Sequence, residues 1–344
     1  MTKKKFLLHF PVIILSLVLL NSCSEQPRTD HVLSGWTMGT YYRITLMQVT
    51  PGQIKSAQSK VNNVLDKINQ SMSVFEPGSE ISRFNEIPAG RKLCVSPDFA
   101  EVMRISFKVY EMTDKAFDPT VAPLIELWGF GTDKSVQDFP HEDQIKKILP
   151  SVGLDKILMD EKGCLVKKHP HTSLNLSGVA KGYAVDLIAR AMEDLKINSY
   201  LVDIGGDMYA GQAKPDGTAW RIGISAPLPQ AGAQDYIETA EITNQALATS
   251  GDYRNYFIKD NIRYSHIIDP ATGYPVRQNI VSATVKADNC ALADALATAM
   301  LIMDKDQALQ LSTESEIFEV LLIQMVQDEE ISVHSSFGFT ETGK

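Results

Sequence analysis

The feature that most constrains the fold is the order of strand-like and helix-like segments after residue 160. Residues 164–204 have the pattern of a strand, a helix and a strand, and four strand-like segments follow at about 220–225, 236–242, 263–268 and 280–286. A helical pattern near 292–303 and a buried strand-like run at 317–324 complete the series. Strands do not alternate regularly with helices, as a parallel sheet would require. The order therefore predicts an α+β fold of mixed, largely antiparallel sheets with packed helices.

The first half of the sequence adds a strand and two helices to this pattern. Residues 41–49 alternate sufficiently for a strand, and apolar residues recur at helical spacing over 54–72. Ser96 is placed as an N-cap, with Pro97 at the first helical position. A second helix is therefore expected from Pro97 to about Met112.

Length and composition indicate one globular unit. The chain has 344 residues, 44% of them hydrophobic and 22% charged, which is ordinary for a folded protein. Neither an internal repeat nor a long linker divides the sequence. We therefore expect a signal peptide over 1–22, a polar tether over 23–31, one folded domain over 32–335 and a C-terminal tail over 336–344.

The first residues have the pattern of a bacterial lipoprotein signal. Lys3, Lys4 and Lys5 precede an apolar stretch that is shorter than the roughly 20 residues of a membrane-spanning helix. The stretch ends in Leu-Asn-Ser-Cys23, which resembles a lipobox, although Asn21 departs from the small residue that is commoner there. We expect an exported lipoprotein that is anchored through lipid on Cys23 and faces the periplasm. The alternative is an unlipidated secretory signal with a chance cysteine.

Charge and cysteine usage narrow the possible partners. Removal of the signal would take away three lysines and no acid and shift the net charge from -9 to -12. An acidic protein of this kind argues against nucleic acid as a partner. Beyond Cys23 the sequence has Cys94, Cys164 and Cys290, an odd number without a Cys-x-x-Cys pair. We therefore expect neither a disulfide framework nor a structural zinc site.

The most informative helix is the segment Ala293–Met300, "ADALATAM". Asp294 and Thr298 are four residues apart and lie on one helical face. A carboxylate and a hydroxyl one turn apart offer two hard oxygen ligands of the kind that Mg²⁺ prefers. The alternative is an exposed aspartate and a threonine that bonds back to the preceding turn, and the pair alone favours that simpler interpretation.

Glycine-rich strand ends offer possible anion sites. In "LNLSGVAKGYAVD", residues 174–186, a strand ends at Ser177-Gly178 and a helix follows almost at once. Free N–H groups at the helix start favour an anion, and Lys181 could add positive charge. The spacing is not that of a Walker A loop. "DIGGD", residues 203–207, is a second such turn, and both could be ordinary connections.

Three other segments could line a pocket. "AFDPTVAPLIELWGFG", residues 116–131, is apolar and aromatic and could form the wall of a site for a flat ligand or pack in the core. In "MSVFEPGSEISRFN", residues 72–85, an aromatic residue follows a helix end. "MGT", residues 38–40, enters the first strand. His266 lies in "YSHIIDPATGYP", and these residues alone do not tell a catalytic histidine from a strand residue.

Together these motifs resemble the ApbE-type FAD:protein FMN transferases, formerly called thiamine-biosynthesis lipoproteins. The resemblance extends from Met38 to the final strands, and a lipobox also fits that family. It rests on motifs that occur in the family's order, namely MGT, SEISRFN, FDPTVAPLIELWGFG, LSGVAKGYAVD, IGGD, TSGDYRNYF, SHIIDPATGYP and ADALAT.

The resemblance implies a set of site residues. Mg²⁺ is held in the family at the positions of Ala180, Asp294 and Thr298. Some members carry an acid before the threonine, where this chain has Ala297. His266 matches the proposed catalytic base. The positions that contact FAD correspond here to Met38, Phe75, Ala116, Phe117, Asp118, Ser177, Tyr183 and Ile268, with Phe75 replacing a more usual tyrosine.

The resemblance also implies a reaction and partners. A threonine hydroxyl of a target flavoprotein attacks the FMN-side phosphorus of FAD, AMP leaves, and FMN is joined through a phosphoester. Family targets include subunits of membrane electron-transport complexes. The alternatives are an Mg²⁺-dependent FAD pyrophosphatase that gives FMN and AMP, and a periplasmic flavin-binding lipoprotein without turnover.

Overall fold

The computed structural model describes residues 27–132, 139–227, 235–252, 256–259, 262–327 and 330–339. The helices are α1 (Pro51–Met72), α2 (Glu80–Glu86), α3 (Pro97–Met112), α4 (Ala122–Leu127), α5 (Glu142–Ile148), α6 (Ala180–Asp194), α7 (Cys290–Met300) and α8 (Lys305–Ser315), with short 3-10 turns at Pro119–Val121, Leu149–Ser151 and Leu154–Lys156. The strands are β1 (Thr29–Thr37), β2 (Thr40–Val49), β3 (Lys92–Cys94), β4 (Ile157–Met159), β5 (Cys164–Lys167), β6 (Tyr200–Ile204), β7 (Asp207–Ala210), β8 (Trp220–Ser225), β9 (Tyr236–Ile242), β10 (Gln245–Gly251), β11 (Tyr256–Lys259), β12 (Ile262–Ser265), β13 (Ile280–Ala287), β14 (Phe318–Gln327) and β15 (Glu330–Ser335).

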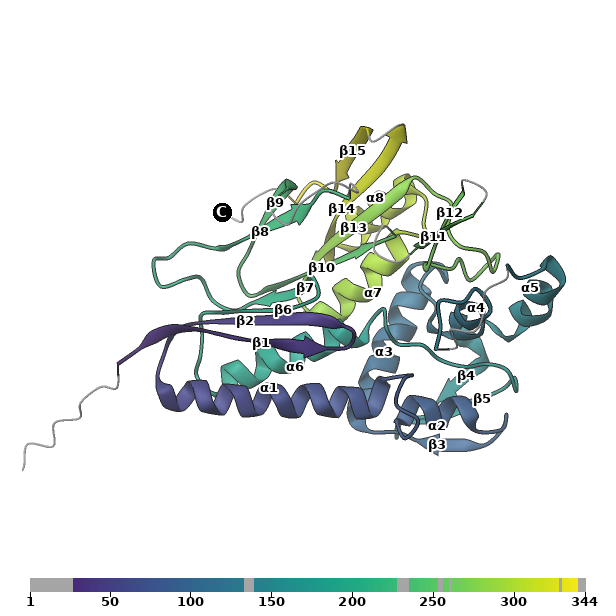
Figure 1. Ribbon diagram of the computed structural model, residues 1–344, viewed down its shortest axis with the longest axis horizontal. Coiled ribbons are helices and arrows are strands. Elements are labelled where there is room, and N and C mark those ends of the chain that lie inside the picture. The colour runs from purple at the N-terminus through teal and green to yellow at the C-terminus, as the bar shows by residue number, and fades with distance from the viewer. Residues whose placement is uncertain are drawn as a thin grey trace, which may run out of the picture.

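An eight-stranded sheet organises the molecule. Its strand order is β1-β2-β6-β7-β10-β13-β14-β15, and each neighbouring pair is antiparallel. Figure 1 shows this sheet crossing the molecule. The α+β prediction with largely antiparallel sheets is confirmed.

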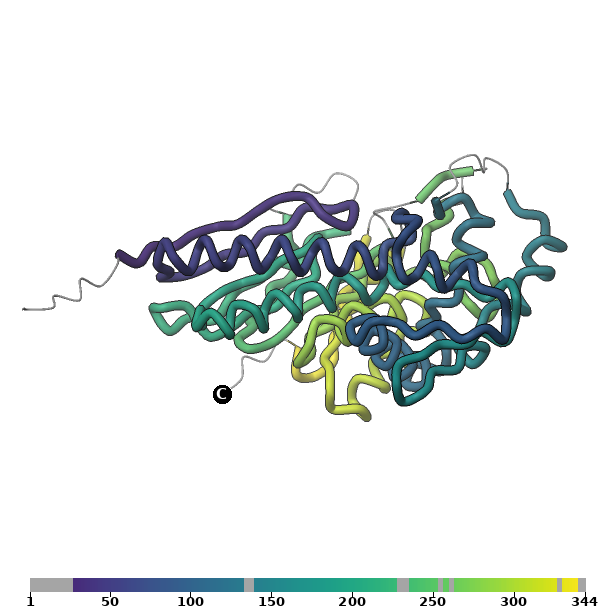
Figure 2. The backbone as a smooth tube through the Cα atoms, turned by 90° about the horizontal axis from the view of Figure 1, so that it is seen from below, coloured from purple at the N-terminus to yellow at the C-terminus, as the bar shows by residue number. Residues whose placement is uncertain are grey.

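Helices cover one face of the sheet and a hairpin covers the other. α1, α6 and α7 pack under the sheet, and Figure 2 shows α1 and α6 running alongside each other. Their buried residues join the main core cluster, which includes Ile44, Val61 and Leu296. On the opposite face the β8–β9 hairpin contributes Trp220 and Ile222 to a second core with strands of the sheet. The sheet is therefore covered by packed side chains on both faces.

Most predicted elements are confirmed within a few residues. The helix expected from Pro97 to Met112 has those bounds, and the Ser96 hydroxyl accepts from the amide of Phe99 as an N-cap. β1 differs from expectation because it starts at Thr29, inside the segment expected to be a tether, where Thr29 pairs with Val49 of β2. At the other end, Phe339 is buried in the second core, so packing continues past residue 335.

The prediction that the cysteines would not form disulfides is wrong. Cys94 and Cys164 form a disulfide across 70 residues of sequence, and Cys290 is a free buried cysteine. The physical reason is strand register, because β3 and β5 pair with Cys94 directly opposite Cys164. Residue counting does not show which strands become neighbours.

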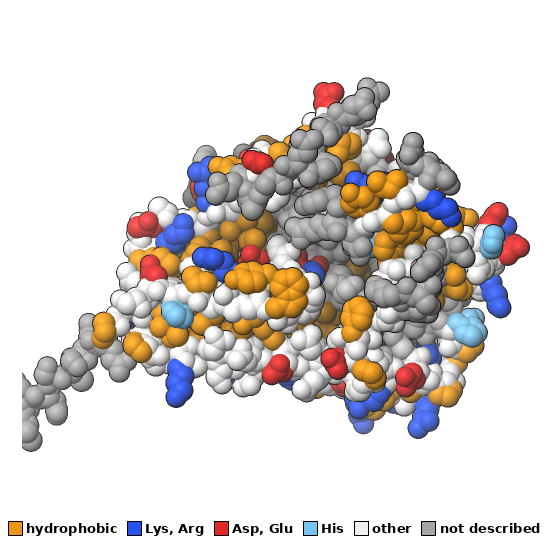
Figure 3. All heavy atoms as spheres, in the orientation of Figure 1, with side chains coloured by type: hydrophobic (Ala, Val, Ile, Leu, Met, Phe, Trp, Pro, Cys, Tyr) orange, Lys and Arg blue, Asp and Glu red, His pale blue; other side chains and the backbone are white. Residues whose placement is uncertain are grey.

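The targeting segment lies outside the described residues, as do Lys3, Asn21 and Cys23. Among the residues that the structure describes, none of the helices is both long and apolar enough to cross a membrane. On the face shown in Figure 3, described Lys and Arg side chains are scattered among Asp and Glu side chains instead of forming one basic patch.

Candidate active site

Two adjoining cavities form one cleft at the N-terminal end of α6. They have volumes of about 400 and 640 Å³ and share Val74, Phe75, Asn175, Ser177 and Lys181 in their walls. The smaller cavity also contains the predicted site residues Ala116, Phe117, Asp118, His266, Ile268, Asp294 and Thr298. The larger one contains Met38 and Ala180. Segments that are far apart in sequence therefore meet at one place.

Helix α7 positions Asp294 and Thr298. Its N-terminus is held by the buried Asp186 of α6, whose carboxylate accepts from the amides of Cys290 at 2.7 Å and Ala291 at 2.9 Å. These bonds satisfy amides that a helix start leaves unpaired. α7 is therefore fixed to α6 a few residues before the candidate ligands.

Asp294 is a buried carboxylate with two kinds of partner. Its Oδ2 accepts from the amide of Gly182 at 3.1 Å, and its Oδ1 lies 3.5 Å from the ammonium nitrogen of Lys181. Lys181 also forms an ion pair with Asp207. Burial, followed by the charge of Asp207, raises the pKa of Asp294 above its ordinary value. Removing a charged partner would therefore leave a costly buried anion.

Thr298 shows both behaviours that its sequence position suggested. Its hydroxyl donates to the backbone carbonyl of Asp294 at 3.2 Å, as a helical threonine often does. The same Oγ1 lies 3.3 Å from the hydroxyl of Ser250 on β10 and faces the smaller cavity. Bonding back to the helix therefore does not remove this oxygen from the site.

The donor set fits a hard divalent cation. The Asp294 carboxylate and the Thr298 hydroxyl line the smaller cavity and are oxygen ligands that suit Mg²⁺, which keeps several waters. Ala180, the third position that the resemblance implies, lines the larger cavity. The Lys181 ammonium beside Asp294 shows that the position favours positive charge. Among the described residues, the structure has no group of three or more His, Cys, Asp and Glu side chains that could hold a metal. A cation here would depend on hydroxyl and backbone oxygens together with Asp294.

His266 follows β12 and is carried by a tight turn. Residues 267–276 fold back on themselves, with Val276 donating to the Ile267 carbonyl at 2.9 Å and Gly273 donating to the Asp269 carbonyl at 2.8 Å. The indole of Trp128 donates to the Gly273 carbonyl at 2.8 Å and ties the turn to the C-terminal end of α4. This network holds the His266 backbone beside the cavity.

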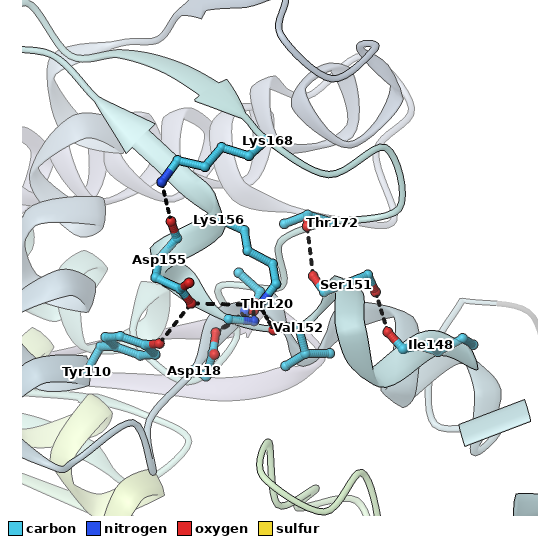
Figure 4. A network of polar contacts seen from close by, with 11 residues as sticks. Tyr110, Asp118, Thr120, Ile148, Ser151, Val152, Asp155, Lys156, Lys168 and Thr172 are labelled. Atoms are coloured by element: carbon cyan, nitrogen blue, oxygen red, sulfur yellow. Dashed lines mark hydrogen bonds and ion pairs between the residues drawn. The ribbon is translucent and has the colours of Figure 1, made fainter. Parts of the chain in front are cut away.

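The segment Ala116–Asp118 is anchored from behind by the polar network in Figure 4. Asp118 Oδ1 accepts from the hydroxyl of Thr120 at 2.6 Å and from its amide at 2.8 Å. The Thr120 hydroxyl accepts in turn from the Gly153 amide at 2.6 Å. Burial raises the pKa of Asp118 to about 6, against the lowering effect of the Thr120 bonds. The sequence indicated Asp118 but not this supporting network.

Met38, Phe75 and Ser177 occupy the rim of the cleft. Met38 and Gly39 form the turn between β1 and β2, with φ of 47° and 72°. Phe75 is 68% exposed and contributes to the walls of both cavities. The amide of Ser177 donates to the side-chain oxygen of Asn175 at 3.0 Å, which stabilises the loop that leads into α6. An exposed ring next to a cleft is available for stacking with a flat ligand.

Tyr183 is the predicted site residue that the structure does not bring to the cleft. It is 3% exposed, lines neither cavity, and donates its hydroxyl to Asp98 at 3.0 Å. Tyr183 lies one turn further along α6 than Ala180, and its side chain packs in the main core cluster. We therefore assign it to support of the cleft.

Three polar residues of this region were not singled out from the sequence. Asp186 and Ser250 lie inside motifs that were recognised, but nothing in the local pattern distinguishes them. Asp207 follows two glycines, and its role became visible when β7 placed it beside Lys181. The signal that could have identified Asp207 from the sequence was a polar residue directly after two glycines at the end of a strand.

Fold and cleft define the class of protein. An antiparallel α+β domain joins a carboxylate and a hydroxyl, a histidine and an apolar wall in one cavity, as a phosphoryl-transfer enzyme with a large, partly flat substrate would require. The chain belongs to the ApbE family, whose sequence model matches residues 38–322.

Named relatives share most of the chain. It is 37% identical over 320 residues to the FAD:protein FMN transferase of Vibrio cholerae, covering 92% of this chain and 94% of the relative. The Escherichia coli FAD:protein FMN transferase is 33% identical, with 82% of each chain covered. The solved structure of flavin transferase ApbE from Vibrio cholerae has a TM-score of 0.82 at 33% identity and covers 91% of this chain and 99% of that one. The apo Pseudomonas stutzeri flavinyl transferase ApbE has a TM-score of 0.82 at 28% identity, with coverage of 92% and 99%.

Proposed function

We propose that this chain is an FAD:protein FMN transferase that depends on Mg²⁺. It moves FMN from FAD to a threonine hydroxyl of a target flavoprotein through a phosphoester bond. The observation that carries the proposal is that His266, Asp294 and Thr298, from a turn and a helix, line the same cavity of about 400 Å³. Relatives with the named activity cover nearly the whole chain.

The reaction is a displacement at phosphorus. The threonine Oγ forms a bond to the FMN-side phosphorus, and the bond from that phosphorus to the bridging oxygen breaks, so AMP leaves with the bridging oxygen. His266 accepts the hydroxyl proton as general base. Mg²⁺, held by Asp294, Thr298 and the carbonyl of Ala180, would neutralise the diphosphate. The protein contributes positioning and charge more than covalent chemistry.

The cleft walls suit the two ends of FAD. Phe75 is exposed between the cavities and can stack on a planar ring. Ala116, Phe117 and Ile268 give the smaller cavity an apolar side, and Met38 does so for the larger one. Lys181 lines both cavities at the first turn of α6, where it can face a diphosphate that spans them.

Two other activities use the same residues. If water replaces the threonine, the enzyme becomes an FAD pyrophosphatase that releases FMN and AMP. A flavin-binding protein without turnover would retain FAD and release no AMP. The cation position and histidine in one cavity favour a catalyst over a carrier.

The test uses the protein from residue 27 onward with FAD, Mg²⁺ and a candidate target domain, followed by intact mass of the target. We expect the target to gain one FMN residue, and the gain to disappear when its acceptor threonine is changed to alanine. AMP release without a mass gain would indicate the pyrophosphatase. Neither product would indicate a flavin-binding protein.

We propose further that the protein acts outside the cytoplasm, anchored through Cys23, on a subunit of a membrane electron-transport complex. The disulfide between Cys94 and Cys164 supports export, because such bonds persist in oxidising compartments. Cell fractionation tests the anchor. Cys23→Ser should move the protein from the membrane fraction to the soluble fraction, and unchanged membrane association would contradict lipidation.

A further inference from the structure

Lys181 lies between two buried carboxylates from different elements. Its ammonium is ion-paired with Asp207 at the start of β7 and is 3.5 Å from Oδ1 of Asp294 on α7. The side chains of Asp207 and Asp294 are 2% and 3% exposed, whereas that of Lys181 is 28% exposed and faces both cavities. One cation therefore serves two anions, and it lines both cavities, whereas Asp294 lines the smaller one.

Asp207 is held rigidly by its backbone. It pairs with Ile204 at the end of the β6–β7 hairpin, and the two-residue turn between them consists of Gly205 and Gly206, with φ of 64° and 99°. The amide of Gly206 donates to Asp203 at 2.9 Å. Glycine is the residue that adopts such φ values without strain. The β6–β7 turn therefore fixes the backbone position of Asp207.

Asp294 is equally fixed, and Lys181 is the mobile partner. Asp294 accepts from the Gly182 amide, and α7 is held at its start by Asp186. Lys181 carries its charge on a flexible four-carbon stem. A divalent cation at Asp294 would meet this ammonium at close range in a buried setting, where repulsion is strong.

We propose that Lys181 is a displaceable counter-ion of Asp294 and that Asp207 is a positioning residue which holds the ammonium aside when the cation binds. This inference rests on the cation position of the proposed function. With Asp207 present, the lysine keeps a fixed partner after it leaves Asp294 and remains at the cleft to face the substrate diphosphate. Without Asp207, the lysine has Asp294 as its remaining buried anion and competes with the cation.

The test is isothermal titration of Mg²⁺ alone into the FAD-free protein, so that binding is read without turnover. Lys181→Met should raise Mg²⁺ affinity about tenfold or more, because the competing charge is gone. Asp207→Asn should lower it by a similar factor. In the Lys181→Met background, Asp207→Asn should have an effect at least threefold smaller, because there is no ammonium left to hold.

Several outcomes would overturn the inference. If Asp207→Asn has the same effect in both backgrounds, Asp207 acts as a general negative charge. If Lys181→Met leaves Mg²⁺ affinity unchanged or lowers it, the lysine does not compete with the cation. Lys181→Gln repeats the test if the methionine variant does not fold, as judged by circular dichroism.

A control separates this inference from the proposed function. Asp294→Asn should abolish Mg²⁺ binding, and if it does not, the cation position itself is wrong. If Asp294→Asn abolishes binding while Lys181→Met changes nothing, the cation position stands and the counter-ion inference fails.

Discussion

Thr298 keeps partial solvent contact on a helix whose other residues are buried. Its hydroxyl bonds to the Asp294 carbonyl and also faces Ser250 and the cavity. A single oxygen therefore satisfies a helical bond and remains near the cleft. At the residue scale, the Thr298 hydroxyl therefore has a structural contact within its helix and a second contact at the wall of the cavity.

The histidine prediction concerns rate. His266→Ala should lower FMN transfer by about two to four orders of magnitude, the usual contribution of a general base, while FAD affinity stays nearly constant. The rate of the wild type should also fall in acid, because protonation removes the base. Single-turnover transfer and the FAD dissociation constant are measured for each variant. A His266→Gln variant within about threefold of wild type would show that the histidine only positions its turn.

The Phe75 prediction concerns binding. Phe75→Ala should weaken FAD binding by about 1–3 kcal/mol, the scale of aromatic stacking and burial. Phe75→Tyr should change affinity little, since the ring is kept. Phe337, which is 85% exposed and lines neither cavity, provides the control, and Phe337→Ala should leave FAD affinity unchanged. A tenfold gain in Phe75→Tyr would mean that a hydroxyl matters more than stacking.

The Asp118 prediction concerns pH. Its folded pKa is raised from 3.8 to about 6, so the folded protein holds this proton more tightly than the unfolded chain does. Stability from this group is full below about pH 4 and falls as pH rises through about 6. The free energy of unfolding of the wild type relative to Asp118→Asn should therefore drop by about 2 kcal/mol from pH 4 to 7. Urea titrations without FAD measure it, and a pH-independent difference would contradict the assignment.

At the element scale, the close approach of α6 and α7 determines where Asp294 lies. A Cβ at Gly182 would lie 2.6 Å from the carbonyl carbon of Cys290 and 2.9 Å from the Cα of Ala291, both backbone atoms. Backbone cannot move aside as a side-chain end can. The glycine is therefore needed so that its own amide reaches Asp294.

Gly182→Ala should separate the two helices, lower the free energy of unfolding by about 1–3 kcal/mol and weaken Mg²⁺ binding. Gly52→Ala on α1 is the matched control, because its Cβ would approach no closer than 4.0 Å to Thr50 Oγ1. That variant should be neutral or stabilised by up to about 1 kcal/mol. Urea unfolding and Mg²⁺ titration distinguish the two, and equal tolerance of both substitutions would refute the packing argument.

At the scale of the whole molecule, the disulfide closes a long loop that contains α3, the Ala116–Asp118 wall and α5. Cys94→Ser with Cys164→Ser should lower stability by about 4 kcal/mol, the loop-closure value for a separation of 70 residues. Thermal unfolding with and without reductant measures this. The double variant should no longer respond to reductant, and a wild type that is equally insensitive would show that the bond contributes little.

Local pattern was sufficient to predict many of the helices and strands. The Ser96-Pro97 cap and the apolar period of α1 are short-range signals, so their helices could be predicted from neighbouring residues. Asp294 and Thr298 share a helix face for the same reason. His266 and the glycine turns became interpretable through the resemblance of their motifs, in their order along the chain, to those of the ApbE family. The sequence by itself therefore determined the α+β class and most residues of the cleft.

Only the tertiary structure decided which distant residues meet. Strand register places Cys94 opposite Cys164, and the β6–β7 turn places Asp207 beside Lys181. Helix packing turns Tyr183 away from the cleft toward Asp98. Each outcome depends on contacts between segments separated by tens of residues, and such contacts leave no periodic trace in the sequence. Local propensity therefore cannot specify them, whereas the packing of layers does.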